Sequence, residues 1–173
     1  MNPDASFGSR TFAGMARGAA LMGVLLCAGC GFRLAGSGPL PTALAHPYLE
    51  LKDPYTDFSR EFERQLSGAG AKLQSARDGA SATIEVTKDL VKQTTLAVSA
   101  NNIPTLYELS YSVTFAVHGG GKELMAPQTI NVSKDYSFEE NALLAKEHEA
   151  DILRAQMARD LVAIAMHRLA NLK

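Results

Sequence analysis

The side chains that could carry out a reaction are scattered along the sequence. None of the four histidines stands in a His-Glu-x-x-His pattern or beside a cysteine, so the ligand spacing of a zinc site is missing. Glu147, His148 and Glu149 are consecutive, and consecutive residues of a helix point to different faces. No serine has a glycine two positions away on both sides, and no glycine-rich phosphate loop is present. The sequence therefore predicts no metal, cofactor or catalytic residue, although carboxylates that are distant in sequence could still meet in space.

The two cysteines lie at the end of an apolar segment near the N-terminus. Residues 19–28 are apolar and follow Arg10 and Arg17, which is the pattern of a secretory signal. This segment is shorter than the roughly 20 residues that a transmembrane helix needs. Alanine and glycine then precede Cys30, as small residues do at the cleavage site of a lipoprotein signal peptidase. We expect Cys30 to become the mature N-terminus and to carry a diacylglyceryl thioether and an N-acyl chain.

Alternatives stay open within this segment. Cys27 is a second acceptor, but the bulky Leu26 before it fits such a peptidase poorly. A compact signal also begins at Met15, so translation starts at either Met1 or Met15. The segment could also be a buried helix with two inert thiols, a reading that the flanking arginines disfavour.

The rest of the chain has the composition of one folded domain. The 173 residues include 17 basic and 18 acidic side chains, and 46% are hydrophobic. This near-neutral charge excludes the basic surface that nucleic-acid-binding proteins use. Glycine and proline are frequent in residues 35–47 and predict an extended tether. We expect a signal peptide at 1–29, a lipidated N-terminus and flexible tether at 30–47, and one domain at 48–173.

Hydrophobic periodicity predicts a strand, a helix and three further strands along this domain. Alternation at 49–51 indicates a short first strand, and Phe58, Phe62 and Leu66 recur every four residues, as in an amphipathic helix. The three following strands, the last two joined by a turn of three glycines, are expected at residues 83–98, 107–117 and 130–138. In the first of these strands, Ile84, Val86 and Leu90 are expected on the same face.

A long helix is expected to close the chain. Serine and glutamate in residues 137–140 fit a capping box, and an apolar stripe follows that includes Met157, Leu161 and Ile164. The resulting order is β-α-β-β-β-α. This order predicts an α+β fold, a two-layer sandwich in which a four-stranded, mostly antiparallel sheet carries two helices on one face.

Several short motifs are distributed over residues 30–173. They are Cys30-Gly31-Phe32-Arg33-Leu34, Asp53-Pro54-Tyr55, Tyr107-Glu108-Leu109, Tyr136-Ser137-Phe138 and Leu144-Ala145-Lys146-Glu147. Together they resemble the LptE family of lipopolysaccharide-assembly lipoproteins. By resemblance to other lipoproteins, Gly31 in place of aspartate implies delivery to the outer membrane.

The resemblance implies a protein that binds and scaffolds without breaking or forming bonds. LptE proteins plug the β-barrel LptD, assist its assembly and help to pass lipopolysaccharide to the cell surface. The implied partners are therefore LptD, lipopolysaccharide and, through the lipid anchor, the inner leaflet of the outer membrane, with the domain facing the periplasm. A lipid-anchored periplasmic binding module for another ligand and a small periplasmic enzyme are the alternative functions.

The resemblance also indicates individual contact residues. Lys146, in the Leu-Ala-Lys-Glu position, is the candidate for binding lipopolysaccharide phosphates, and its alternative is a solvated helix lysine. The expected hairpin tip at 99–104 contains no basic residue. Ile103 and Pro104 at this tip are therefore expected to contact apolar lipid or the barrel wall.

Overall fold

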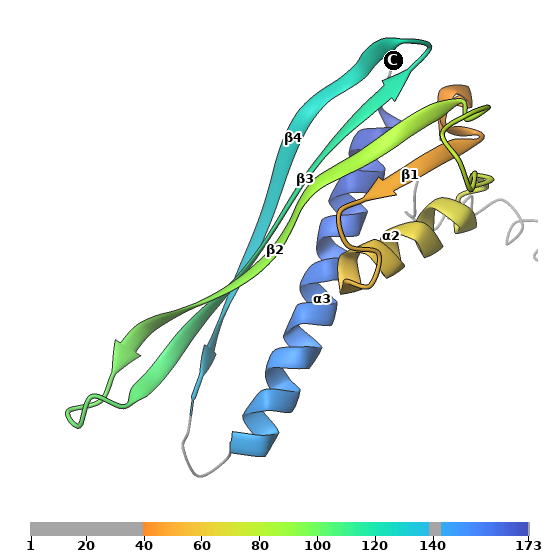
Figure 1. The fold of residues 1–173 in the computed structure, drawn as a ribbon. Helices are drawn as coiled ribbons and strands as arrows, with labels where there is room; N and C mark the ends of the chain where they lie inside the picture. Colours follow the sequence, from red (N-terminus) through yellow and green to blue (C-terminus); the bar gives the residue numbers. More distant parts are fainter. Residues whose placement is uncertain (1–39, 139–142, 173) are drawn as a thin grey trace, which may run out of the picture. The chain divides into compact units, whose positions relative to one another are not determined.

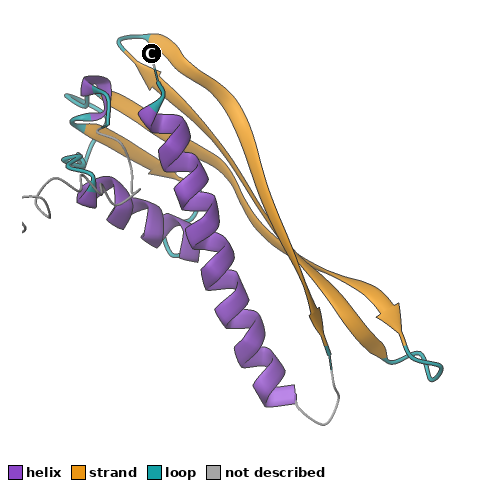
Figure 2. Ribbon diagram, turned by 180° about the vertical axis from the view of Figure 1, so that it is seen from behind, coloured by secondary structure: helices purple, strands orange, loops and turns teal. Residues whose placement is uncertain are grey.

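The computed structural model describes residues 40–138 and 143–172, within the unit that spans Ser37–Lys173. Four strands form one sheet in the order β1-β2-β3-β4, in which β1 is parallel to β2 and the other pairs are antiparallel (Figure 1). The elements are η1 (Thr42–Leu44), β1 (Pro47–Leu51), α2 (Asp57–Gly68), β2 (Ala82–Val98), β3 (Pro104–Gly119), β4 (Lys122–Ser137) and α3 (Leu143–Ala170). Figure 2 shows α2 and α3 on the same side of the sheet. The predicted α+β class and the predicted element order are confirmed.

Helix α2 begins where a side chain caps its first turn. The Thr56 Oγ1 accepts a hydrogen bond from the Ser59 backbone N–H at 3.0 Å. Phe58, Phe62 and Leu66 are fully buried, and the two phenylalanine rings stack with their centroids 5.1 Å apart. Burial of each such side chain stabilises the fold by about 1.5–3 kcal/mol. The predicted helix and its buried face are confirmed.

Strand β3 supplies the centre of the core. Its inward-facing side chains, each at most 2% exposed, are Leu109, Tyr111, Val113, Phe115 and Val117. β3 pairs with β2 on one side and with β4 on the other, so this apolar row lies in the middle of the sheet. The alternation predicted from the sequence is confirmed. Pairing with a strand on each side fixes the register of β3, so its apolar side chains stay on one face.

Strand β2 departs from its predicted pattern. Its pairing with β3 shifts between Val86 and Lys88, so one extra residue enters β2 at this point. An extra residue sends the following side chains to the opposite faces. Leu90 was expected beside Ile84 and Val86 in the core, but it is 51% exposed and pairs with Ser112 on the outer face.

Helix α3 differs from its prediction in one detail. Ser137 is the last residue of β4, and α3 is described from Leu143 onward, so the predicted capping box falls partly outside the described residues. Met157 and Leu161 are fully buried as expected, whereas Ile164 is 37% exposed. The buried row continues instead through Ala165 and Leu169 at intervals of four residues, because that spacing keeps side chains on one face of a helix.

Candidate partner and lipid interface

The hairpin between β2 and β3 ends in an uncharged tip that carries several apolar side chains. The backbone N–H of Ser99 donates to the carbonyl oxygen of Ile103 at 2.7 Å and closes the turn. Leu96 and Val98 are 48% and 51% exposed, and Ile103 and Pro104 are partly exposed. The tip therefore presents apolar side chains without a charged group among them. What Ile103 and Pro104 contact stays a prediction.

The other two predicted site residues lie wholly or partly outside the described part of the chain. Cys30 lies outside the described residues. Lys146 belongs to the first turn of α3, whose backbone is described, but its side chain lies outside the described part. In both views, the start of α3 and the β2–β3 tip lie toward the same end of the sheet, and β1 begins at the other end (Figures 1 and 2).

The face of the sheet that turns away from the helices is polar. Three pairs of neighbouring residues on β3 and β4 lie on this face: Ser110 with Ser133, Ser112 with Asn131, and Thr114 with Thr129. The two threonine hydroxyl oxygens lie 2.8 Å apart and share a hydrogen bond. Hydroxyl and amide groups on an uncovered face can exchange hydrogen bonds with water or with a polar partner.

A groove of about 550 Å³ lies on the helix-bearing face, beside the start of α2. Beneath it, the Thr56 hydroxyl donates to the Asp89 carboxylate at 2.5 Å, and the Phe58 backbone N–H donates to the Tyr111 hydroxyl at 3.3 Å. Burial, reinforced by the negative charge of Asp89, raises the pKa of Tyr111 well above its usual value. Helix α2 is thus joined to β2 and β3 through polar contacts in addition to its apolar face.

The rim of this groove carries aromatic and charged side chains. Tyr55 stands beside the groove and is 80% exposed. Arg60 from α2 pairs with Asp57 at 2.7 Å, and Arg154 from α3 pairs with Asp151 at 3.0 Å. These exposed pairs contribute little to stability, so the side chains can readily exchange partners.

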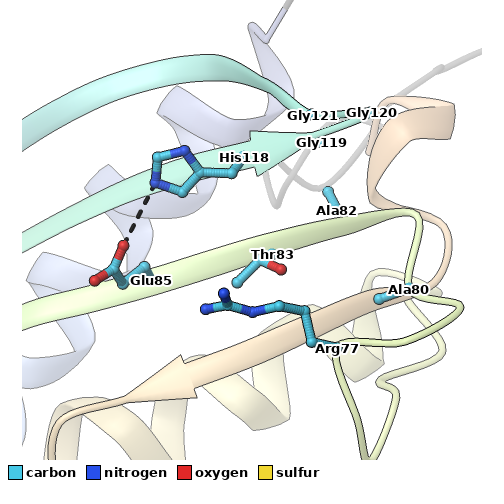
Figure 3. A pocket seen from close by; sticks show the side chains of 9 residues that line it. All are labelled: Arg77, Ala80, Ala82, Thr83, Glu85, His118, Gly119, Gly120 and Gly121. Carbon is cyan, nitrogen blue, oxygen red and sulfur yellow. Dashed lines mark ion pairs between the residues drawn. The ribbon is translucent and has the colours of Figure 1, made fainter.

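A second depression, of about 480 Å³, lies on the sheet near the β3–β4 turn (Figure 3). Its His118 Nε2 lies 3.4 Å from the Glu85 carboxylate, and Arg77 at its edge forms an ion pair with Glu50. Glu50 and Glu85 are register partners on β1 and β2. The two carboxylates therefore each have a basic partner. This pairing on the surface of the sheet explains why the charged side chains lie together.

Glycine is required at the turn beside this depression. Gly120 and Gly121 have φ values of 57° and 73°, in the left-handed region that glycine favours. A Cβ atom at Gly119 would lie 2.7 Å from the Leu124 side chain and 3.3 Å from the Ser81 carbonyl oxygen. The predicted glycine turn is confirmed, and its first glycine allows close approach of a neighbouring segment.

The part of the chain that the structure describes was searched for side-chain clusters that could hold a metal ion and for helices that could cross a membrane. Within residues 40–138 and 143–172, no three histidine, cysteine or acidic side chains gather so that they could hold a metal ion. The described helices, including the long α3, also lack an apolar stretch of the length needed to cross a bilayer.

Comparison with known proteins assigns the fold to a family. Residues 47–169, well over half of the chain, match the lipopolysaccharide-assembly family LptE. The chain belongs to the LptE family. The match runs from the first residue of β1 almost to the end of α3, so it covers every strand and both helices that border the groove.

Individual LptE relatives agree with this assignment. The LPS-assembly lipoprotein LptE of Yersinia pestis (strain Pestoides F) is 30% identical over 137 residues, which cover 79% of this chain and 66% of that protein. The chain thus spans slightly less than two thirds of the length of this relative. The equivalent protein of Yersinia pseudotuberculosis serotype O:1b matches to the same extent.

Solved structures share the LptE fold. Rare lipoprotein B from Shewanella oneidensis superposes with a TM-score of 0.63 at 25% identity, over 73% of this chain and 94% of that one. Lipoprotein B from Nitrosomonas europaea gives a TM-score of 0.66 at 23% identity, over 81% of this chain and 90% of that one. The second likeness concerns the fold alone.

The groove beside α2 was not predicted from the sequence. Its members lie on α2, β2, β3 and α3, and no short motif contains them together. One signal was nevertheless present, because Thr87, Lys88 and Asp89 interrupt an otherwise apolar alternation. Such an interruption within a strand is typical of a bulge, and here the bulge places Asp89 on the helix-bearing face.

Proposed function

We propose that this LptE-family chain is a lipoprotein of the outer membrane that faces the periplasm, binds the LptD barrel, plugs it and assists its assembly. In this role it helps to deliver lipopolysaccharide to the outer leaflet and catalyses no reaction. The observation that carries the proposal is the family match over residues 47–169, and the similar Yersinia protein is an LPS-assembly lipoprotein.

The surfaces of the domain support a role inside a barrel. The lumen of an outer-membrane barrel is polar, whereas its lipid-facing band is apolar. The uncovered face of the sheet, with pairs such as Thr114 and Thr129, offers hydroxyl groups that suit a polar wall. The exposed Leu96 and Val98 at the tip suit an apolar contact instead. We propose that Ile103 and Pro104 belong to this contact and that Lys146 binds a lipid phosphate.

The complex can be tested by co-purification. Membranes that contain the tagged full chain are extracted in mild detergent, and the chains that accompany it are identified. We expect one large outer-membrane β-barrel in near-stoichiometric amount. A chain that purifies without a barrel would contradict the proposal and favour a lipid-anchored module with another ligand.

Ile103→Asp is expected to weaken barrel recovery about tenfold or more, because an unpaired carboxylate would be buried at the contact. Ile103 is only partly buried, so the fold should tolerate the change. Ile103→Val, which keeps an apolar side chain, should leave recovery unchanged. Equal recovery of both variants would remove the tip from the interface.

The anchor is tested by a matched pair of cysteine variants. Cys30→Ala should abolish acylation and leave the chain unprocessed, whereas Cys27→Ala should be processed and anchored like the wild type, because only Cys30 follows two small residues. The measurement is the intact mass of the chain and its partition into detergent. An acylated Cys30→Ala chain would assign the anchor to another residue.

A further inference from the structure

We propose that the groove beside the start of α2 binds an uncharged, hydroxyl-rich saccharide. The inference goes beyond the proposed function, because it requires neither a barrel partner nor a lipid anchor. It rests on an exposed aromatic ring, on planar polar side chains from three elements, and on a local balance of charge. The groove volume of about 550 Å³ lies within the roughly 300–1,000 Å³ of small-molecule sites.

The aromatic platform is Tyr55. Its side chain is 80% exposed, more than any other large hydrophobic side chain in the described part of the chain. The segment that carries it is held in a turn, since the Tyr55 backbone N–H donates to the Asp53 carboxylate at 2.9 Å. A tyrosine ring has few rotatable bonds, so it offers a large contact area at low conformational cost. The C–H faces of a sugar ring stack on such a surface.

The polar lining matches the hydroxyl groups of a saccharide. Asp57, Asp89 and Gln93 carry planar groups that accept hydrogen bonds, and Gln93 also donates. Arg60 and Arg154 add planar donors from α2 and α3. Vicinal hydroxyl groups both donate and accept, so they can satisfy carboxylate, amide and guanidinium groups at one time. An apolar ligand would displace water from these groups and offer them no further hydrogen bond.

The charge of the lining excludes a strongly anionic ligand. Arg60 and Arg154 contribute two positive charges, and Asp57 and Asp89 contribute two negative charges. A phosphate placed between them would be attracted by the guanidinium groups and repelled to a similar extent by the carboxylates. Neutral saccharide hydroxyls meet no such repulsion, and the apolar Val91 and Leu109 on the floor provide contact for ring carbons.

Fluorescence provides a direct test, because the chain contains no tryptophan. Tyr55→Trp introduces a single fluorescent reporter and keeps an aromatic ring at this position. The variant is made in the full chain, which is kept in a detergent that has no sugar headgroup. Two uncharged probes distinguish the source of the saccharide: a neutral hexose oligosaccharide like those of the outer core of lipopolysaccharide, and di-N-acetylchitobiose, which has the N-acetylhexosamine units of peptidoglycan without the lactyl carboxylate. We expect a saturable change in emission with one of them at millimolar concentration. Leu90→Trp, an exposed site on the opposite face, should show no change.

Calorimetry with the responding probe tests the platform itself. Tyr55→Ala should weaken binding about fivefold or more because stacking is lost, and Tyr55→Phe should retain it. Absence of a saturable response to both probes, or equal affinity in Tyr55→Ala and wild type, would overturn the proposal. Barrel recovery in the co-purification experiment is measured separately, so failure of one proposal does not imply failure of the other.

Discussion

Phe62→Ala is expected to lower the free energy of unfolding by about 3–5 kcal/mol. Phe62 is fully buried and its ring stacks on Phe58, so truncation would remove a large apolar contact and leave a cavity between α2 and the rest of the core. Most domains are stable by only about 5–15 kcal/mol, which makes this a large fraction of the total. The corresponding fall in Tm is roughly 10–20 °C.

A matched variant on the same helix separates packing from helix propensity. Glu63 is exposed and adjacent to Phe62, and Glu63→Ala should change stability by no more than about 0.5 kcal/mol. Urea unfolding followed by circular dichroism measures both variants. A loss below about 1 kcal/mol in Phe62→Ala would mean that α2 does not pack on the core as described.

Tyr111→Phe is expected to destabilise the fold by about 1–3 kcal/mol at neutral pH. The hydroxyl of Tyr111 accepts the Phe58 backbone N–H at 3.3 Å, and phenylalanine would leave this buried donor unsatisfied. The same hydroxyl lies near Asp89, which accepts from Thr56 at the start of α2. The variant therefore weakens the connection between α2 and the sheet without creating a large cavity.

The difference between Tyr111→Phe and wild type should shrink at alkaline pH. Burial, with a further contribution from Asp89, raises the pKa of Tyr111 in the folded state above the value near 10 of an unfolded tyrosine. Above pH 10 the unfolded chain loses this proton while the folded chain keeps it, so unfolding becomes more favourable as pH rises. The wild type then loses up to about 1.4 kcal/mol per pH unit that the variant does not lose.

Parallel urea titrations at pH 7 and at several values above pH 10 measure this effect. All other side chains are the same in both proteins, so the difference between the two curves isolates Tyr111. A difference that stays constant with pH would show that the Tyr111 hydroxyl ionises equally in the folded and unfolded chains.

Much of the fold could be predicted because it follows from local periodicity. Phe58, Phe62 and Leu66 recur at helical spacing and are all buried, and β3 alternates without interruption and lies in the centre of the sheet. The candidate site was predicted less fully. The β2–β3 tip was located from the turn between two strands, whereas the groove at Tyr55 depends on residues from four elements. No local pattern records such a convergence, because it arises from packing between elements.

The sequence by itself determined the α+β class, the order of the elements, the buried face of α2 and the resemblance to LptE. These properties depend on spacings of two and four residues, which act within each element. Only the tertiary structure decided that a bulge after Val86 turns Leu90 outward and Asp89 inward, and that β4 extends to Ser137 before α3. Registers and element ends depend on pairing and packing with neighbouring segments, and these interactions can override local propensity.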